Sequence, residues 1–77
     1  MKYSWKDGEN NTSYFYREED GLIVGQAHNV VHTKIWLAKT VGRELNSEKY
    51  LGQYISQESS KRAVEEFVLI SDRTLLN

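Results

Sequence analysis

Few side chains in this sequence have the types and spacing that catalysis or metal binding needs. His28 and His32 flank a predicted hairpin and could lie near one another, but a zinc site needs three or four ligands, and no cysteine or suitably spaced carboxylate completes the set. Glu18, Glu19 and Asp20 offer three carboxylates, yet adjacent residues of an extended chain point to alternate faces. We interpret the histidines as turn and rim residues and the carboxylates as a solvated turn.

No nucleophile stands in a catalytic pattern. The sequence has no cysteine, no glycine-rich phosphate loop and no nucleophile elbow. Ser56, Ser59 and Ser60 are explained by helix capping and close packing. A domain with one helix also lacks the walls of a deep pocket. We therefore predict a protein that is not an enzyme, with no cofactor, no metal and no small-molecule substrate.

The aromatic residues are the main candidates for binding. Trp and Tyr favour interfaces because each has an apolar body and a polar tip. If one face of a sheet packs on a helix and no second layer covers the other, aromatic residues there bury themselves on another protein. The predicted partner is a second copy, in a homodimer, or another protein. The alternative without a partner is that these rings belong to the core of a folded monomer. The candidate interface residues are Tyr14, Tyr16, Trp36, Tyr50 and Tyr54.

Nucleic acid is the alternative partner. Single-strand binders stack bases on sheet aromatics beside a basic groove. The candidate contacts are Lys34, Trp36, Lys39, Arg43 and Lys49. A net charge of −1 argues against this alternative, because each neutralised phosphate needs its own Lys or Arg. A third class, an inhibitor of another enzyme, stays open because acidic runs such as 18–20 can mimic phosphates.

Short strands must position these residues. Turn-forming residues at 7–13 and 17–21 flank an aromatic segment at 13–17, which predicts an N-terminal pair of strands. Apolar residues on both sides of a polar break at 28–33 predict two strands joined by a hairpin. In the second of these strands, one of two alternating sets must meet the helix. The first set is Ile35, Leu37 and Val41, and the second is Trp36, Ala38 and Thr40.

A last strand then leads directly into a helix. After a loop at 42–48, strict alternation over 50–55 puts Leu51 and Ile55 on one face and Tyr50, Gly52 and Tyr54 on the other. Small residues, among them Gly25, Gly52 and Ala38, would let the helix approach the sheet closely.

The helix is predicted from its cap and its period. Ser56 has the chemistry of an N-cap, and Glu58 suits the positive end of the helix dipole. Glu58 with Arg62, and Lys61 with Glu65, are spaced for ion pairs on a solvent face. The buried stripe follows a period of 3.6 and consists of Ser60, Ala63, Val64, Phe67 and Val68.

Length and composition favour one folded domain. The 77 residues, 39% of them hydrophobic and 27% charged, are typical of a single globular core. Within it we separate N-terminal strands (1–20), a three-stranded meander (21–55), and a helix with its tail (56–77). No apolar run approaches the roughly 20 residues that cross a bilayer, and the first residues lack the apolar core of a signal peptide. We expect no membrane segment and a cytoplasmic location.

About 45 residues, from Leu22 to Phe67, resemble the AP2-type domain, a family that includes plant transcription factors and relatives attached to phage integrases and homing endonucleases. The similar residues are 36–38 (WLA), 50–54 (YLGQY), Ser56, Glu58, Ala63 and Glu65. The resemblance implies a three-stranded sheet on one helix, with DNA contacted by the sheet. That family carries several arginines on its first two strands, whereas this chain has Gln26, His28, Lys34 and Lys39 there. The spacing is also similar to that of small tailed-phage proteins, which implies a phage-type accessory role.

The overall prediction is an α+β protein. It has an antiparallel meander of about four to five strands and one C-terminal helix packed on one face of the sheet.

Overall fold

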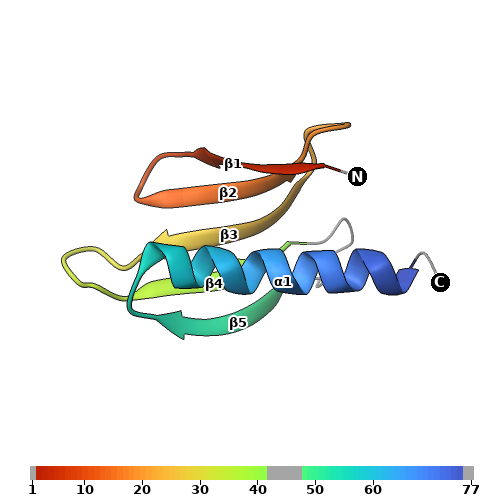
Figure 1. Cartoon of the computed structure of the whole chain (residues 1–77). Helices are drawn as coiled ribbons and strands as arrows, with labels where there is room; N and C mark the ends of the chain where they lie inside the picture. The colour runs from red at the N-terminus through yellow and green to blue at the C-terminus, as the bar shows by residue number, and fades with distance from the viewer. Residues whose placement is uncertain (1, 42–47, 76–77) are drawn as a thin grey trace.

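A computed structural model describes residues 2–41 and 48–75 of the chain, with an antiparallel five-stranded sheet followed by one helix (Figure 1). The strands lie in the sheet in their chain order, so each pairs with its neighbour in sequence. This meander, with one C-terminal helix on one face, confirms the predicted α+β fold. The elements are β1 (Tyr3–Asp7), β2 (Thr12–Arg17), β3 (Ile23–Asn29), β4 (Trp36–Thr40), β5 (Lys49–Tyr54) and α1 (Gln57–Leu75).

Asparagine forms the β1–β2 turn, as the sequence predicts. Asn10 and Asn11 both have left-handed backbone, with φ of 58° and 56°, a conformation that asparagine tolerates better than most residues. The Gly8 N–H donates to the Thr12 carbonyl at 2.8 Å and closes the turn.

The acidic run at 18–20 belongs to the β2–β3 turn, where Asp20 has a structural role. Its carboxylate forms an ion pair with Arg17, accepting from Arg17 Nε at 3.0 Å, and it also accepts from the Leu22 N–H at 3.1 Å. The hydrogen bond to Asp20 raises the pKa of Arg17 above its ordinary value. Glu18 and Glu19 are exposed, so the run is a solvated turn.

The helix begins and packs where the sequence predicts. Ser56 Oγ accepts from the Ser59 N–H at 3.1 Å, which is an N-cap hydrogen bond. Ser60 and Val64 are fully buried, and Val68 is 9% exposed. Val64 lies directly on β3, since a Cβ added at Gly25 would be 2.3 Å from Val64 Cγ1. Because glycine has no side chain, Val64 of the helix can pack directly against the backbone of β3 at Gly25.

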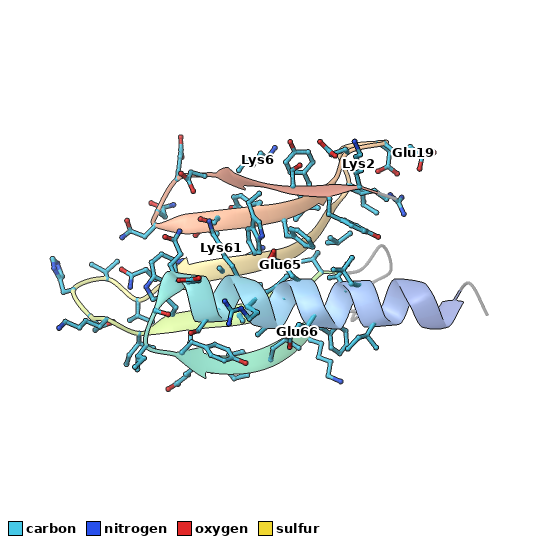
Figure 2. All side chains as sticks on the ribbon, viewed as in Figure 1. Lys2, Lys6, Glu19, Lys61, Glu65 and Glu66 are labelled. Atoms are coloured by element: carbon cyan, nitrogen blue, oxygen red, sulfur yellow. The ribbon has the colours of Figure 1, made fainter. Side chains whose placement is uncertain are left out.

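α1 lies along β3, β4 and β5 in Figure 1, while β1 and β2 extend beside it. On the helix side of β1 and β2, three aromatic rings close the core: Phe15 lies 5.3 Å from Tyr3 and 4.8 Å from Trp5, measured between ring centroids. Lys61 Nζ lies 5.1 Å from the Trp5 ring centroid. Figure 2 shows Lys61 and Glu65 along the helix edge nearer β2, and Glu66 along the other edge.

One of the two ion pairs predicted on the solvent side of the helix is confirmed. Arg62 and Glu58 form the expected pair at 3.4 Å. Lys61 was expected to pair with Glu65, but its ammonium lies over the indole of Trp5 instead. The prediction treated the helix surface alone, whereas β1, at the edge of the sheet, supplies an aromatic partner for the lysine.

The predicted faces of the last strand were wrong at Tyr50 and Leu51, since Leu51 packs against the same core as Tyr54. The register shifts between Ala38 and Lys39, where β4 pairs with β5: Ala38 pairs with Gly52, and Lys39 pairs with Tyr50. Leu51 is thus the extra residue of a β-bulge, which puts Tyr50 on the face opposite Gly52.

Two other predictions for this strand were also wrong. Leu51 packs against the core, but Ile55 is 87% exposed and lies outside the strand. A Cβ added at Gly52 would meet only the Tyr54 ring, at 3.7 Å or more. Its φ of 144°, rather than close approach of the helix, favours glycine there.

Candidate binding surface

One face of the sheet packs on α1, and among the described residues no element covers the other face. Ala38 and Phe15 belong to the core on the helix side, so their neighbours along each strand point to the opposite side. We call this opposite side the open face. Its residues are Ser4, Lys6, Thr12, Tyr14, Tyr16, Ile23, Gln26, His28, Leu37, Lys39, Tyr50 and Gln53.

A single row of paired residues crosses the open face from one edge of the sheet to the other. Lys6 pairs with Tyr14, Tyr14 with Gln26, Gln26 with Lys39, and Lys39 with Tyr50. The Cβ atoms of residues paired in this way lie about 5 Å apart, so these side chains are neighbours on the face. The row, which we call the central row, places two cations and two phenol rings around one carboxamide.

A shallow pocket of about 310 Å³ lies on this face. It is lined by Gln26, His28, Leu37, Lys39 and Tyr50. Tyr50 is 57% exposed, which leaves most of its ring available for contact. The pocket is open and mixed in polarity, which suits a contact surface better than an enclosed ligand site.

Several polar side chains of the open face contact other residues of the chain. Lys6 Nζ lies 5.5 Å from the Tyr16 ring centroid, and Lys39 Nζ lies 3.4 Å from Glu48 Oε2. His28 Nδ1 and Thr12 Oγ1 share a hydrogen bond of 2.8 Å. Both lysine contacts involve exposed side chains and are weak, so another molecule can replace them at little cost.

The five predicted interface residues do not share one surface. Tyr14, Tyr16 and Tyr50 lie on the open face. Trp36 and Tyr54 pair with each other on the helix side, where Tyr54 packs against the core. Trp36 lines a second pocket of about 250 Å³ together with Asp7, Ser13 and Gln57. The second strand of the hairpin thus turns its Trp36, Ala38 and Thr40 set toward the helix.

The predicted nucleic-acid contacts are also dispersed. Lys39 lies on the open face, Lys34 is exposed in the β3–β4 turn, and Trp36 is on the helix side. Lys49 Nζ lies 4.9 Å from the Phe67 ring centroid, beside the helix. Arg43 lies outside the described residues. The structure therefore does not bring this set together as a basic groove.

Sequence reasoning missed Lys6, Gln26 and Leu37 as members of the binding surface. Gln26 and Leu37 follow from alternation once Gly25 and Ala38 are placed against the helix. The same alternation from Trp5 places Lys6 there. That signal was present in the sequence, but it needed the knowledge of which set faces the helix.

The two histidines lie in different settings. His28 is on the open face, and His32 is exposed in the β3–β4 turn with a left-handed φ of 63°. Within residues 2–41 and 48–75, no group of three histidine, cysteine or acidic side chains is arranged to hold a metal ion. In the same part of the chain, no helix combines the length and apolarity needed to span a bilayer.

The chain matches no protein-family model, no curated protein and no solved structure. The resemblance to the AP2-type domain and to small phage proteins therefore stays a prediction, and the surface itself has to carry the functional argument.

Proposed function

We propose that this protein is a small non-catalytic accessory protein that acts through a protein interface on its open face. The observation that carries the proposal is the contrast between the two faces of the sheet. The helix side is closed by a buried core, whereas the open face presents three tyrosines and Leu37 without a covering layer among the described residues. A sheet face that carries several aromatic side chains and has no covering layer suits a contact with another protein surface.

Nucleic acid is the second candidate occupant, and the central row favours it. Lys6 and Lys39 alternate there with Tyr14 and Tyr50, and this combination of cations and rings suits stacked bases and phosphates. The AP2-type resemblance supports the same partner. We rank it second because the other basic candidates, Lys34 and Lys49, lie away from the open face.

Solution mass tests the proposal and separates the two occupants. We expect a Tyr50→Ala variant to lose association while it keeps its fold, because Tyr50 is exposed on the open face. Trp36→Ala is the matched control. Its ring is on the helix side, so the change should lower stability and leave association intact.

Light scattering at low and high salt, with and without a short single strand or duplex, gives the readout. Protein association that responds little to salt supports the interface. A monomer whose mass rises only with added nucleic acid at low salt would replace it with the second candidate.

A further inference from the structure

We propose that a second copy of this chain packs on the open face, about a two-fold axis that runs along β3 above Gln26. The inference rests on the proposed function, which makes the open face a protein interface, and it names the partner. The order of residues in the central row carries it. From β1 to β5 the row consists of Lys6, Tyr14, Gln26, Lys39 and Tyr50.

This order is self-complementary. Gln26 is the middle residue, and each side of it holds one lysine and one tyrosine. Rotation by 180° about an axis along β3 exchanges the β1 side of one copy with the β5 side of the other. Lys6 then lies opposite Tyr50 of the second copy, and Tyr14 lies opposite Lys39. Gln26 lies opposite Gln26.

Each of these facing pairs is chemically favourable. A lysine ammonium is attracted to the face of a tyrosine ring, so the row forms four such pairs across the interface. A carboxamide has both donors and acceptors, so two copies of Gln26 can bond to each other. Lys39 keeps Glu48 beside it, and its charge is not buried without a counter-ion.

The charges favour this axis over the perpendicular two-fold axis, which runs along the central row. An axis along the central row would place Lys6 opposite Lys6 and Lys39 opposite Lys39, which is repulsive. The axis along β3 opposes no lysine to a lysine in this row. A two-fold interface needs one patch that complements itself, and the central row has that property in one orientation only.

The flanking rows agree with the same axis. Ile23 lies on β3, where it pairs with Tyr16. Because the axis runs along β3, Ile23 faces Ile23 of the second copy and makes an apolar contact with it. His28 pairs with Leu37 on one side and Thr12 on the other. In the second copy, Leu37 therefore lies opposite Thr12, and His28 opposite His28, with no opposed charges of fixed sign.

Sheet geometry is compatible with this arrangement. Stacked sheets cross at about 30° because of their twist, so facing residues on the edge strands are displaced by about 5 Å. Lysine and tyrosine side chains span that distance. The face is about 24 Å by 17 Å from strand spacing and rise, which places the dimer at the small end of specific interfaces. Association should therefore be measured at protein concentrations up to several hundred micromolar.

Charge exchange at Gln26 tests whether a two-fold axis passes above that residue. Gln26→Lys and Gln26→Glu each place like charges opposite each other at the axis, so each variant alone should be monomeric. Mixed in equal amounts, they place opposite charges there and should form a heterodimer. Native mass spectrometry detects the heterodimer when one variant carries an isotopic mass label. Gln26→Ser is the neutral control and should dimerise, and circular dichroism checks that each variant is folded.

The outcomes separate this inference from the proposed function. If both charged variants remain dimeric alone, or if the mixture stays monomeric, the axis at Gln26 is wrong. If the wild type is monomeric at all concentrations, the second copy is wrong as the occupant, and a different protein on the open face remains as the proposed function. Binding of a nucleic acid that rises with Gln26→Lys and falls with Gln26→Glu would overturn both. The pair Ile23→Lys and Ile23→Glu tests the direction of the axis, because Ile23 faces Ile23 of the second copy only when the axis runs along β3. This pair also replaces the Gln26 pair if a Gln26 variant fails to fold.

Discussion

The contact between Gly25 and Val64 sets the distance between the helix and the sheet, and enlarging Gly25 should destabilise the fold. A Cβ at this position would lie 2.3 Å from Val64 Cγ1. Carbon atoms in contact are normally about 3.5–4.0 Å apart, so Gly25→Ala must move the two carbon atoms apart by about a further 1.2–1.7 Å. Overpacking of this kind costs about 1–3 kcal/mol.

The expected net change in the free energy of unfolding is smaller than this cost. Gly→Ala stabilises by about 0.4–1 kcal/mol through the unfolded chain, which leaves a net loss of about 1–2 kcal/mol in the free energy of unfolding. Removing Val64 Cγ1 should relieve most of the clash. The Lys39 carbonyl oxygen at 3.3 Å stays as a tight contact, whereas Val64 Cβ at 3.6 Å is an ordinary one. In a Val64→Ala background, Gly25→Ala should therefore change stability by less than about 0.5 kcal/mol.

The four proteins of this cycle are the wild type, Gly25→Ala, Val64→Ala and the double variant. Urea denaturation, monitored by circular dichroism at one fixed protein concentration, measures the coupling between the two positions. We expect an interaction energy of about 1–2 kcal/mol. Gly21→Ala is a matched control, since nothing lies within 4 Å of a Cβ there and its cost comes from the φ of 71°. That cost should be the same with and without Val64→Ala. Equal costs of Gly25→Ala in both backgrounds would refute the close contact of helix and strand.

Three other predictions concern single contacts. Ser56→Ala removes the acceptor of the Ser59 N–H and should lower the free energy of unfolding by about 1 kcal/mol, whereas Ser56→Asp should retain it; equal stability of the two variants in urea denaturation would contradict the N-cap. A double-mutant cycle of Glu58→Ala and Arg62→Ala should give a coupling below about 0.5 kcal/mol, because the side chains are 83% and 66% exposed; a coupling above about 1 kcal/mol would show a stronger pair than this geometry allows. The pKa of Arg17 is raised in the folded state, so its pairing with Asp20 stabilises the fold below the unfolded-state pKa and is lost only as pH rises through the higher folded-state pKa. The stability difference between wild type and Arg17→Gln should therefore not change with pH between about 7 and 10. A steady decline of this difference over that range would contradict the prediction.

Local features of the chain were predictable from the sequence because they depend on neighbours a few residues away. The N-cap at Ser56 and the stripe through Ser60, Val64 and Val68 follow from side-chain chemistry and the 3.6-residue period. The turn at Asn10 and Asn11 follows from their tolerance of left-handed backbone. Five short strands and one amphipathic helix leave few architectures, so the α+β meander was also predictable.

The candidate surface was predictable only in part. Tyr14 and Tyr16 were expected at an interface and do lie on the open face. Trp36 and Tyr54 were expected there too, but they lie on the helix side, because alternation defines two faces without saying which one meets the helix. Tyr50 separates from Tyr54 because of the bulge at Leu51, and a bulge depends on how β5 pairs with β4 rather than on β5 alone.

The sequence by itself determined which residues alternate along each strand and where the helix begins, since these properties arise from backbone geometry and local hydrogen bonding. Only the tertiary structure decided which strand residues stand side by side. The row from Lys6 to Tyr50 joins positions that are far apart in the chain, and it exists because hydrogen bonding between strands sets their register. Register depends on contacts between distant segments, which no single segment of the sequence specifies.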